Sequence, residues 1–237
     1  MAIEIPELGD ERHRLWCDLM DLVAEQGGTW TIIGAHMVAL YAWEAGLDSR
    51  PSDDVDVLVN VRLATNGTEE ISHFLRQREY ELDVTDSALG HLFRRGTAQV
   101  DVLAPDGLSE RSNTRTLRPL RTVKVPGGTQ ALKRTSLVRV RSRDVEGELP
   151  RPDLLGAILV KIRAIEKDDV PDAQRGDVAL LLQLVDTPDE LAKDLSRPEK
   201  RWLRRHQYFS DPTDPMWDRF HADEPEISAL VFRRLVA

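Results

Sequence analysis

Two aspartates, Asp54 and Asp56, are the residues whose type and spacing point most directly to chemistry. They stand in DVDVLVN (54–60), where polar and apolar residues alternate as in a β-strand. Because side chains alternate between the two faces of a strand, both carboxylates share one face and the valines occupy the other, which we expect in the core. Like charges this close repel unless a cation lies between them, and Mg²⁺ prefers such oxygen ligands.

A third aspartate repeats this pattern. In QVDVLA (99–104), Asp101 lies on the face opposite Val100 and Val102. If this strand lies beside the strand of Asp54 and Asp56, the three carboxylates form a cluster that can hold two Mg²⁺ ions about 4 Å apart. Acidic residues at strand ends are common, so the surrounding sequence has to support this metal site.

A glycine junction precedes the first two aspartates. TWTII (29–33) is rich in β-branched and aromatic residues and predicts a strand, Gly34 ends it, and residues 36–45 predict a helix. Such a junction presents backbone N–H groups that can bind a phosphate. A tight turn without a ligand is the alternative explanation of Gly34. His36 is expected to cap the helix or to be exposed.

Together these segments resemble a known signature. TIIGAHMVALYAWEAGLDSRPSDDVDVLVN (31–60) is similar to the signature region of the DNA polymerase β-like nucleotidyltransferase superfamily: an apolar strand, a glycine with a small residue, a helix, then D-h-D (h apolar), with a third Asp on a later strand. More narrowly, RPSDDVD (50–56) fits the R-x-[ST]-x-D-h-D form of AbiEii-like enzymes, the toxin half of bacterial toxin–antitoxin pairs.

The resemblance implies roles for individual residues. It assigns Asp54, Asp56 and Asp101 as metal ligands and Gly34 as the phosphate loop. It implies further contacts to the nucleotide from Ala35, Arg50, Ser52 and Lys161. Ala35 departs from the family, which usually has Ser or Gly there; a hydroxyl contact to the γ-phosphate is lost, although the backbone N–H remains.

Lys161 has two interpretations. On a helical wheel it falls inside the apolar stripe of helix 152–167, and Asp177 falls on the apolar side of helix 172–185. A buried Lys161–Asp177 ion pair is the structural interpretation, since charged residues rarely enter a core unpaired. The functional interpretation has Lys161 binding nucleotide phosphates. LLGAILVKIRAI followed by RGDVALLLQL resembles the AbiEii-like pattern of a Lys helix before D-[LIV]-x-x-L, which favours a functional role.

Charge is distributed unevenly along the chain. The net charge is −9, which disfavours a general nucleic-acid-coating protein. Residues 111–143, here called the cationic strip, nevertheless contain ten Lys or Arg and no Asp or Glu. The strip predicts either a site for an anionic partner such as RNA or a solvated β-rich surface.

The element pattern predicts an α+β fold, a mixed β-sheet nucleotidyltransferase core with flanking helices, followed by a mainly helical C-terminal half. The boundary is expected at residue 147, giving a nucleotidyltransferase-like sheet-rich domain (1–147) and a helical domain (148–237). Helices are predicted at 11–26, 36–45, 68–78, 152–167, 172–185, 190–195, 199–207 and 227–235. Strands are predicted at 29–33, 54–60, 80–85, 91–95, 99–104, 121–125 and 136–141.

The cellular setting follows from composition. Cys17 is the only cysteine, which excludes a disulfide framework and a cysteine-based zinc site within the chain. The sequence has no apolar run long enough to span a membrane and no secretory signal pattern. We therefore expect a cytoplasmic protein with no membrane association.

The leading hypothesis is an Mg²⁺-dependent enzyme that moves a nucleoside monophosphate from an NTP to an acceptor, which can be RNA, a protein hydroxyl or a small molecule. The AbiEii resemblance implies a toxin that acts on tRNA or a translation component and has an antitoxin partner. A small-molecule (antibiotic-type) nucleotidyltransferase is the alternative enzyme. A non-catalytic nucleotide-binding module on the same fold is the alternative outside enzymes.

Overall fold

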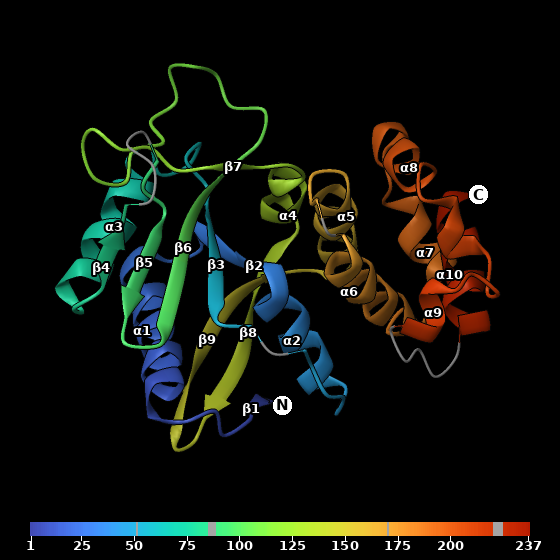
Figure 1. The fold of residues 1–237 in the computed structure, drawn as a ribbon, viewed down its shortest axis with the longest axis horizontal. Helices are drawn as coiled ribbons and strands as arrows, with labels where there is room; N and C mark the ends of the chain where they lie inside the picture. Colours follow the sequence, from blue (N-terminus) through green and yellow to red (C-terminus); the bar gives the residue numbers. More distant parts are fainter. Residues whose placement is uncertain (51, 85–88, 170, 220–224) are drawn as a thin grey trace. The chain divides into compact units, whose positions relative to one another are not determined.

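The computed structural model describes residues 1–50, 52–84, 89–169, 171–219 and 225–237 (Figure 1). The chain divides into two compact units, Met1–Asp153 and Leu154–Ala237. The boundary predicted at residue 147 lies inside the strand β9 (Val145–Pro152), so the first unit extends to the end of that strand. Thr85, the last residue of the strand predicted at 80–85, lies outside the described residues.

The larger sheet of the first unit is mixed, as predicted. Its order is β2-β3-β6-β5-β4, and β7 pairs with the end of β6. The pairing of β3 with β6 is parallel, whereas β2 runs antiparallel to β3 and β5 runs antiparallel to both β6 and β4. The strands are β2 (Trp30–Ile33), β3 (Asp54–Val59), β4 (Glu81–Asp83), β5 (Leu92–Arg95), β6 (Ala98–Pro105) and β7 (Lys124–Val125).

The register of this sheet brings distant residues together. Asp56 lies opposite Ile33 of β2 on one side and opposite Asp101 of β6 on the other. Val55, Val57 and Val59 are fully buried, so the valine face of β3 belongs to the core as predicted. The carboxylates of β3 consequently face away from that core.

A second sheet in the same unit was only partly predicted. Its order is β1-β8-β9, formed by Ile3–Ile5, Thr135–Ser142 and Val145–Pro152. Neither β1 nor β9 was predicted. The strand β1 has only three residues, too few to show a periodicity, and Pro150 and Pro152 argue against a strand at β9. Proline is tolerated in β9 because this strand lies at the edge of the sheet. The short helix α4 (Gly128–Lys133) was also missed.

Three longer helices pack on the sheets of the first unit (Figure 1). They are α1 (Asp10–Gln26), α2 (Gly34–Glu44) and α3 (Gly67–Gln77). The helix α1 contacts α3 and β6, and α2 contacts β2 and β3. Because α2 begins directly after the last residue of β2, its N-terminus is fixed at the edge where β3 begins.

The second unit is helical. Its elements are α5 (Leu154–Ile165), α6 (Asp172–Gln183), α7 (Pro188–Lys193), α8 (Arg197–Leu203), the 3₁₀ helix η1 (Gln207–Ser210), α9 (Met216–Arg219) and α10 (Pro225–Val236). The helix predicted at 152–167 begins two residues late, after β9 ends at Pro152. The helix α8 ends at Leu203 rather than at 207. Within the described part of the chain, none of the helices has both the length and the apolar character needed to cross a membrane.

Candidate active site

The three predicted carboxylates meet at one place. Asp54 and Asp56 come from the same face of β3, and Asp101 lies opposite Asp56 on the adjacent parallel strand β6. Each offers a carboxylate oxygen, and these oxygens all lie within 4.8 Å of one another. All three residues are partly exposed, so an ion in solution can reach them. Three oxygen donors at this spacing fit a hard divalent cation such as Mg²⁺.

Hydrogen bonds orient two of these carboxylates. The hydroxyl of Ser52 donates to Oδ1 of Asp54 at 3.0 Å, and Nδ1 of His91 donates to Oδ1 of Asp101 at 2.8 Å. The hydrogen bond to Asp101 raises the pKa of His91 above its ordinary value, against the effect of burial. A carboxylate has two oxygens, so a hydrogen bond to one is compatible with a cation on the other.

The contribution of His91 was missed. The strand predicted at 91–95 begins with His91, whereas β5 begins one residue later at Leu92, so strand alternation did not place this side chain. Its backbone carbonyl accepts a hydrogen bond from the amide of Val102, and this fixes it beside the strand that carries Asp101. A histidine at the start of the strand predicted at 91–95 was the only signal available.

Gly34 lies directly against the cluster. Its φ of +69° favours glycine, and a Cβ at this position would stand 1.7 Å from Oδ2 of Asp56. The backbone at the start of α2 therefore approaches the carboxylate as closely as packing allows. The N-cap residue, Ile33, makes no side-chain hydrogen bond to this helix N-terminus. Backbone N–H groups in the first turn of a helix are suited to bind a phosphate, which the sequence predicts here.

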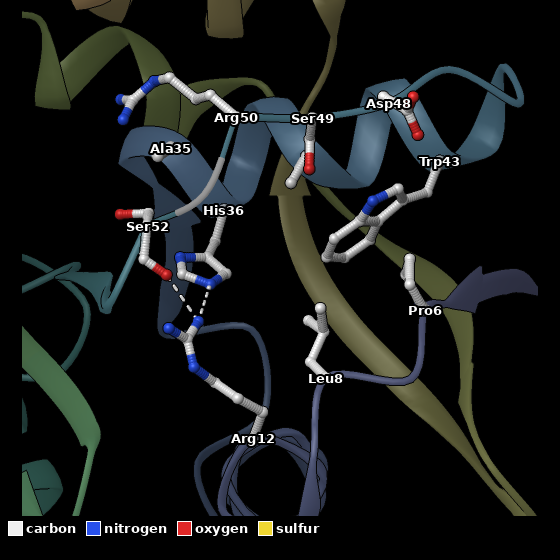
Figure 2. A pocket seen from close by; sticks show the side chains of 11 residues that line it. Pro6, Leu8, Arg12, Ala35, His36, Trp43, Asp48, Ser49, Arg50 and Ser52 are labelled. Carbon is white, nitrogen blue, oxygen red and sulfur yellow. Dashed lines mark hydrogen bonds between the residues drawn. The ribbon is translucent and has the colours of Figure 1, made fainter.

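A cavity of about 330 Å³ opens beside the start of α2 (Figure 2). Ala35, Arg50 and Ser52, three of the four predicted nucleotide-contacting residues of this unit, line it, whereas Gly34 does not. Pro6 and Leu8 of the N-terminal segment form a facing apolar wall together with Trp43 of α2. This wall was not predictable from sequence patterns, because the N-terminal segment reaches it through the pairing of β1 with β8.

His36 is buried rather than exposed, contrary to expectation. Only 3% of the residue is exposed; its Nδ1 donates to the backbone carbonyl of Asp54 at 2.9 Å. Its Nε2 accepts from Nη1 of Arg12 at 3.4 Å (Figure 2). Burial, followed by the charge of Arg12, lowers the pKa of His36 to about 4, so the ring is neutral at physiological pH.

Arg12 joins the same network from α1. Its guanidinium donates to the backbone carbonyl of Ser52 at 2.6 Å and to Oδ1 of Asp53 at 2.6 Å. Figure 2 shows dashed lines from the guanidinium to both the His36 ring and Ser52, and all three residues line the cavity. Two helices, α1 and α2, thus hold the three residues that lead into β3. The contacts of His36 with the carbonyl of Asp54 and of Arg12 with the carbonyl of Ser52 were not predicted, because a backbone acceptor leaves no mark on residue type.

Lys161 belongs to the second unit, where it is paired. Its Nζ lies 2.7 Å from Oδ2 of Asp177 and donates to Oε1 of Gln174 at 3.0 Å. The side chains of Lys161 and Asp177 are only 4% and 3% exposed. The buried ion pair between Lys161 of α5 and Asp177 of α6, which was the structural interpretation of the sequence, is therefore present. A contact of Lys161 with phosphate stays a prediction.

The cationic strip does not lie on a single element. Its members are divided among the segment around β7, the helix α4 with its C-cap, and the strand β8, and β7 and β8 belong to different sheets. On β8 and just after it, acids neutralise them: Arg141 pairs with Glu4 at 2.9 Å and with Glu146, and Arg143 pairs with Glu7 and with Asp10. The parallel pairing of β1 with β8 brings these N-terminal acids alongside.

Comparisons with known proteins bear on the fold. No protein-family model matches the sequence. No curated protein sequence matches it. Among solved structures, the antibiotic-resistance factor ANT(2'')-Ia aligns over 73% of this chain and 83% of that chain, with 12% identity and a TM-score of 0.43.

A second solved structure is more similar in fold. It is an antigenic nucleotidyltransferase-like protein from Paracoccidioides brasiliensis, with a TM-score of 0.53 and 10% identity. The alignment covers 94% of this chain and 94% of that chain, so it extends over nearly all of both. The chain therefore has a nucleotidyltransferase-like α+β fold, with a divalent-cation-compatible carboxylate cluster at the start of β3.

Proposed function

We propose that this protein is an Mg²⁺-dependent nucleotidyltransferase that moves a nucleoside monophosphate from an NTP to an acceptor. The observation that carries the proposal is the meeting of Asp54, Asp56 and Asp101 beside the glycine that begins α2. The nucleotidyltransferase-like fold supports it. Transfer of this kind depends on positioning and charge neutralisation more than on covalent chemistry by the protein.

The carboxylate cluster would hold the metal. Asp54, Asp56 and Asp101 supply the oxygens, and bound Mg²⁺ would neutralise the charge of the triphosphate and lower the pKa of an attacking hydroxyl. Ser52 and His91 hold two of these carboxylates in fixed orientations. Fixed ligands matter because a metal site loses affinity when the groups that orient its ligands are removed.

The start of α2 would bind the phosphates of the donor. Its first-turn backbone N–H groups would donate to phosphate oxygens, and the absence of a Cβ at Gly34 lets the carboxylate of Asp56 lie against this helix start. Arg50 and Ser52 line the adjoining cavity, whose volume of about 330 Å³ is sufficient for part of a nucleotide. Lys161 is proposed as an additional phosphate ligand; its ammonium has three donors, of which Asp177 and Gln174 each occupy one.

For the acceptor, we propose tRNA or a translation component, with the protein acting in the cytoplasm as the toxin of a toxin–antitoxin pair. The R-x-[ST]-x-D-h-D segment at 50–56 supports this choice. A small-molecule acceptor of the antibiotic type is the second candidate. The neutralisation of Arg141 and Arg143 by acids favours it, because a polyanion has fewer available cations to bind.

One experiment tests both the reaction and the acceptor. The protein is incubated with Mg²⁺ and each α-labelled NTP, separately with total tRNA, cell-lysate protein and a panel of hydroxyl-bearing antibiotics. We expect label in one acceptor class, lost with EDTA and in Asp56→Asn. No label in any class, together with NTP affinity that EDTA leaves unchanged, would contradict the enzymatic proposal and favour a non-catalytic nucleotide-binding module.

A further inference from the structure

The imidazole of His36 contacts the backbone of Asp54, the first of the three clustered aspartates. It lies in the first turn of α2 and is almost completely buried. Both ring nitrogens are engaged: Nδ1 with the carbonyl of Asp54, and Nε2 with the guanidinium of Arg12. Both ring nitrogens therefore bind groups of the protein rather than solvent.

We propose that His36 is a positioning residue that, with Arg12, fixes the backbone of Asp54 and so sets the direction of its carboxylate. The inference rests on the proposed function for the role of Asp54 as a metal ligand. The contact itself is independent of that role, because it joins a side chain to a backbone carbonyl.

The sheet explains why such a contact is needed. The pairing of β2 with β3 ends where Ile33 meets Asp56, because the chain then turns into α2. Asp54 is the first residue of β3 and has a strand neighbour in β6, where it lies opposite Gln99. On the side of β2, the ring of His36 takes the place of a strand partner and donates from Nδ1 to the carbonyl of Asp54.

Arg12 extends the support to the preceding loop. It holds the carbonyl of Ser52 and the carboxylate of Asp53, and the hydroxyl of Ser52 in turn donates to Oδ1 of Asp54. The carboxylate of Asp54 is thus fixed twice, through its own backbone by His36 and through Ser52 by Arg12. Loss of either anchor leaves the first residue of β3 freer to turn.

The cavity makes His36 accessible to chemical rescue. Both His36 and Arg12 line it, so His36→Ala opens a space continuous with a cavity of about 330 Å³. Added imidazole can enter that space and restore a donor to the carbonyl of Asp54. His36→Asn keeps a donor without addition, because its side-chain amide nitrogen stands where Nδ1 stands in histidine.

The test compares His36→Ala, His36→Asn and, as a control, His73→Ala, which removes an exposed histidine from α3. Mn²⁺ affinity is measured by calorimetry, and amide exchange of the segment 52–58 is measured by mass spectrometry on metal-free protein. We expect His36→Ala to bind Mn²⁺ roughly 10- to 100-fold more weakly and to exchange faster in that segment. Imidazole should reverse both effects, and His36→Asn and His73→Ala should stay within about threefold of the original protein.

The outcomes separate the two proposals. Unchanged Mn²⁺ affinity and unchanged exchange in His36→Ala would overturn the positioning role. If His36→Ala does not fold, His36→Asn decides: wild-type affinity supports the role, and affinity as weak as that expected for alanine overturns it. If the unmodified protein binds Mn²⁺ but labels no acceptor, only the proposed function fails. If it binds no Mn²⁺, the exchange comparison alone decides for His36.

Discussion

The backbone of Gly34 and the carboxylate of Asp56 are in contact so close that a Cβ on Gly34 would stand 1.7 Å from Oδ2 of Asp56. We expect Gly34→Ala to displace this carboxylate and to abolish Mn²⁺ binding, measured by calorimetry. Gly46→Ala is the matched control, since Gly46 has a φ of +71° but nothing within 4 Å of a Cβ. Both should lose about 1–2 kcal/mol in the free energy of unfolding from backbone strain. Equal metal affinity in the two variants would contradict the close-packed site.

Asp56→Asn should separate metal binding from folding. The amide has the shape of the carboxylate but carries no charge, so we expect little change in the melting temperature of metal-free protein. Nucleotidyl transfer should fall on the order of a hundredfold or more, because the metal loses a central ligand. The measurement is labelled transfer at saturating Mg²⁺, alongside a thermal melt. A variant that transfers at the original rate would exclude Asp56 from the metal site.

His91 should titrate at a higher pH than an ordinary histidine. The hydrogen bond to Asp101 raises its pKa above 6.5 in metal-free protein. A raised histidine pKa stabilises the fold, and this contribution is complete below about pH 6.5 and is lost as the pH rises through the folded-state pKa. Imidazole NMR signals measure the shift, which Asp101→Asn should reverse. A titration of His91 that is identical in both proteins would show that the pair does not form.

His36 behaves in the opposite sense in the same NMR experiment. Burial lowers its pKa to about 4, so the ring should stay neutral until the pH approaches that value. Its stabilising effect is present above about pH 6.5 and is lost as the pH falls toward 4. A His36 signal that titrates near 6.5 would mean that the ring is exposed to water in solution.

The pair of Lys161 and Asp177 should contribute to the stability of the second unit. Lys161→Ala leaves a buried carboxylate without its cation, and we expect a loss of about 3–5 kcal/mol in the free energy of unfolding. Urea denaturation measures it, and Lys161→Met combined with Asp177→Leu should restore most of the loss. Lys193→Ala is the control, because its pair with Glu190 is 68% exposed on both sides and contributes at most about 1 kcal/mol. A similar small loss in Lys161→Ala would mean that Asp177 finds another partner.

The remaining exposed part of the cationic strip can be tested by charge reversal. Arg118 is 78% exposed and lies 3.8 Å from Glu69, which leaves it available to an anion. Arg118→Glu with Arg121→Glu should weaken use of a tRNA acceptor and flatten its salt dependence, while NTP affinity changes little. Arg141→Glu with Arg143→Glu serves as the comparison, since acids already surround those two. Equal effects of the two double variants would argue against a docking site near β7.

Much of the carboxylate cluster was predictable because it depends on strand alternation. The period of two placed Asp54 and Asp56 on one face and the buried valines on the other. The same rule placed Asp101, and the parallel register then joined the three. The helical wheel likewise identified both members of the Lys161–Asp177 pair, since a charged residue inside an apolar stripe needs a partner.

Contacts between segments far apart in sequence were not predictable. The strand β1 is too short to show a period, so its pairing with β8 and the neutralisation of Arg143 by Glu7 and Asp10 left no local signal. The bond from His36 to the carbonyl of Asp54 depends on where β2 ends, and a backbone acceptor leaves no mark on residue type. The local sequence pattern thus determines which face of a strand or helix a side chain occupies, whereas the assembled sheets determine which distant residue it contacts.

The pairing of β3 with β6 also determines when, during synthesis of the chain, the three carboxylates can come together. A ribosome releases Asp54 and Asp56 long before Asp101, and α3, β4 and β5 must all emerge between them. Until β6 joins the sheet, a nascent chain holds only two of the three carboxylates and has no complete metal site. A protein proposed to modify tRNA or the translation apparatus would therefore be inert until β6 has emerged and paired with β3.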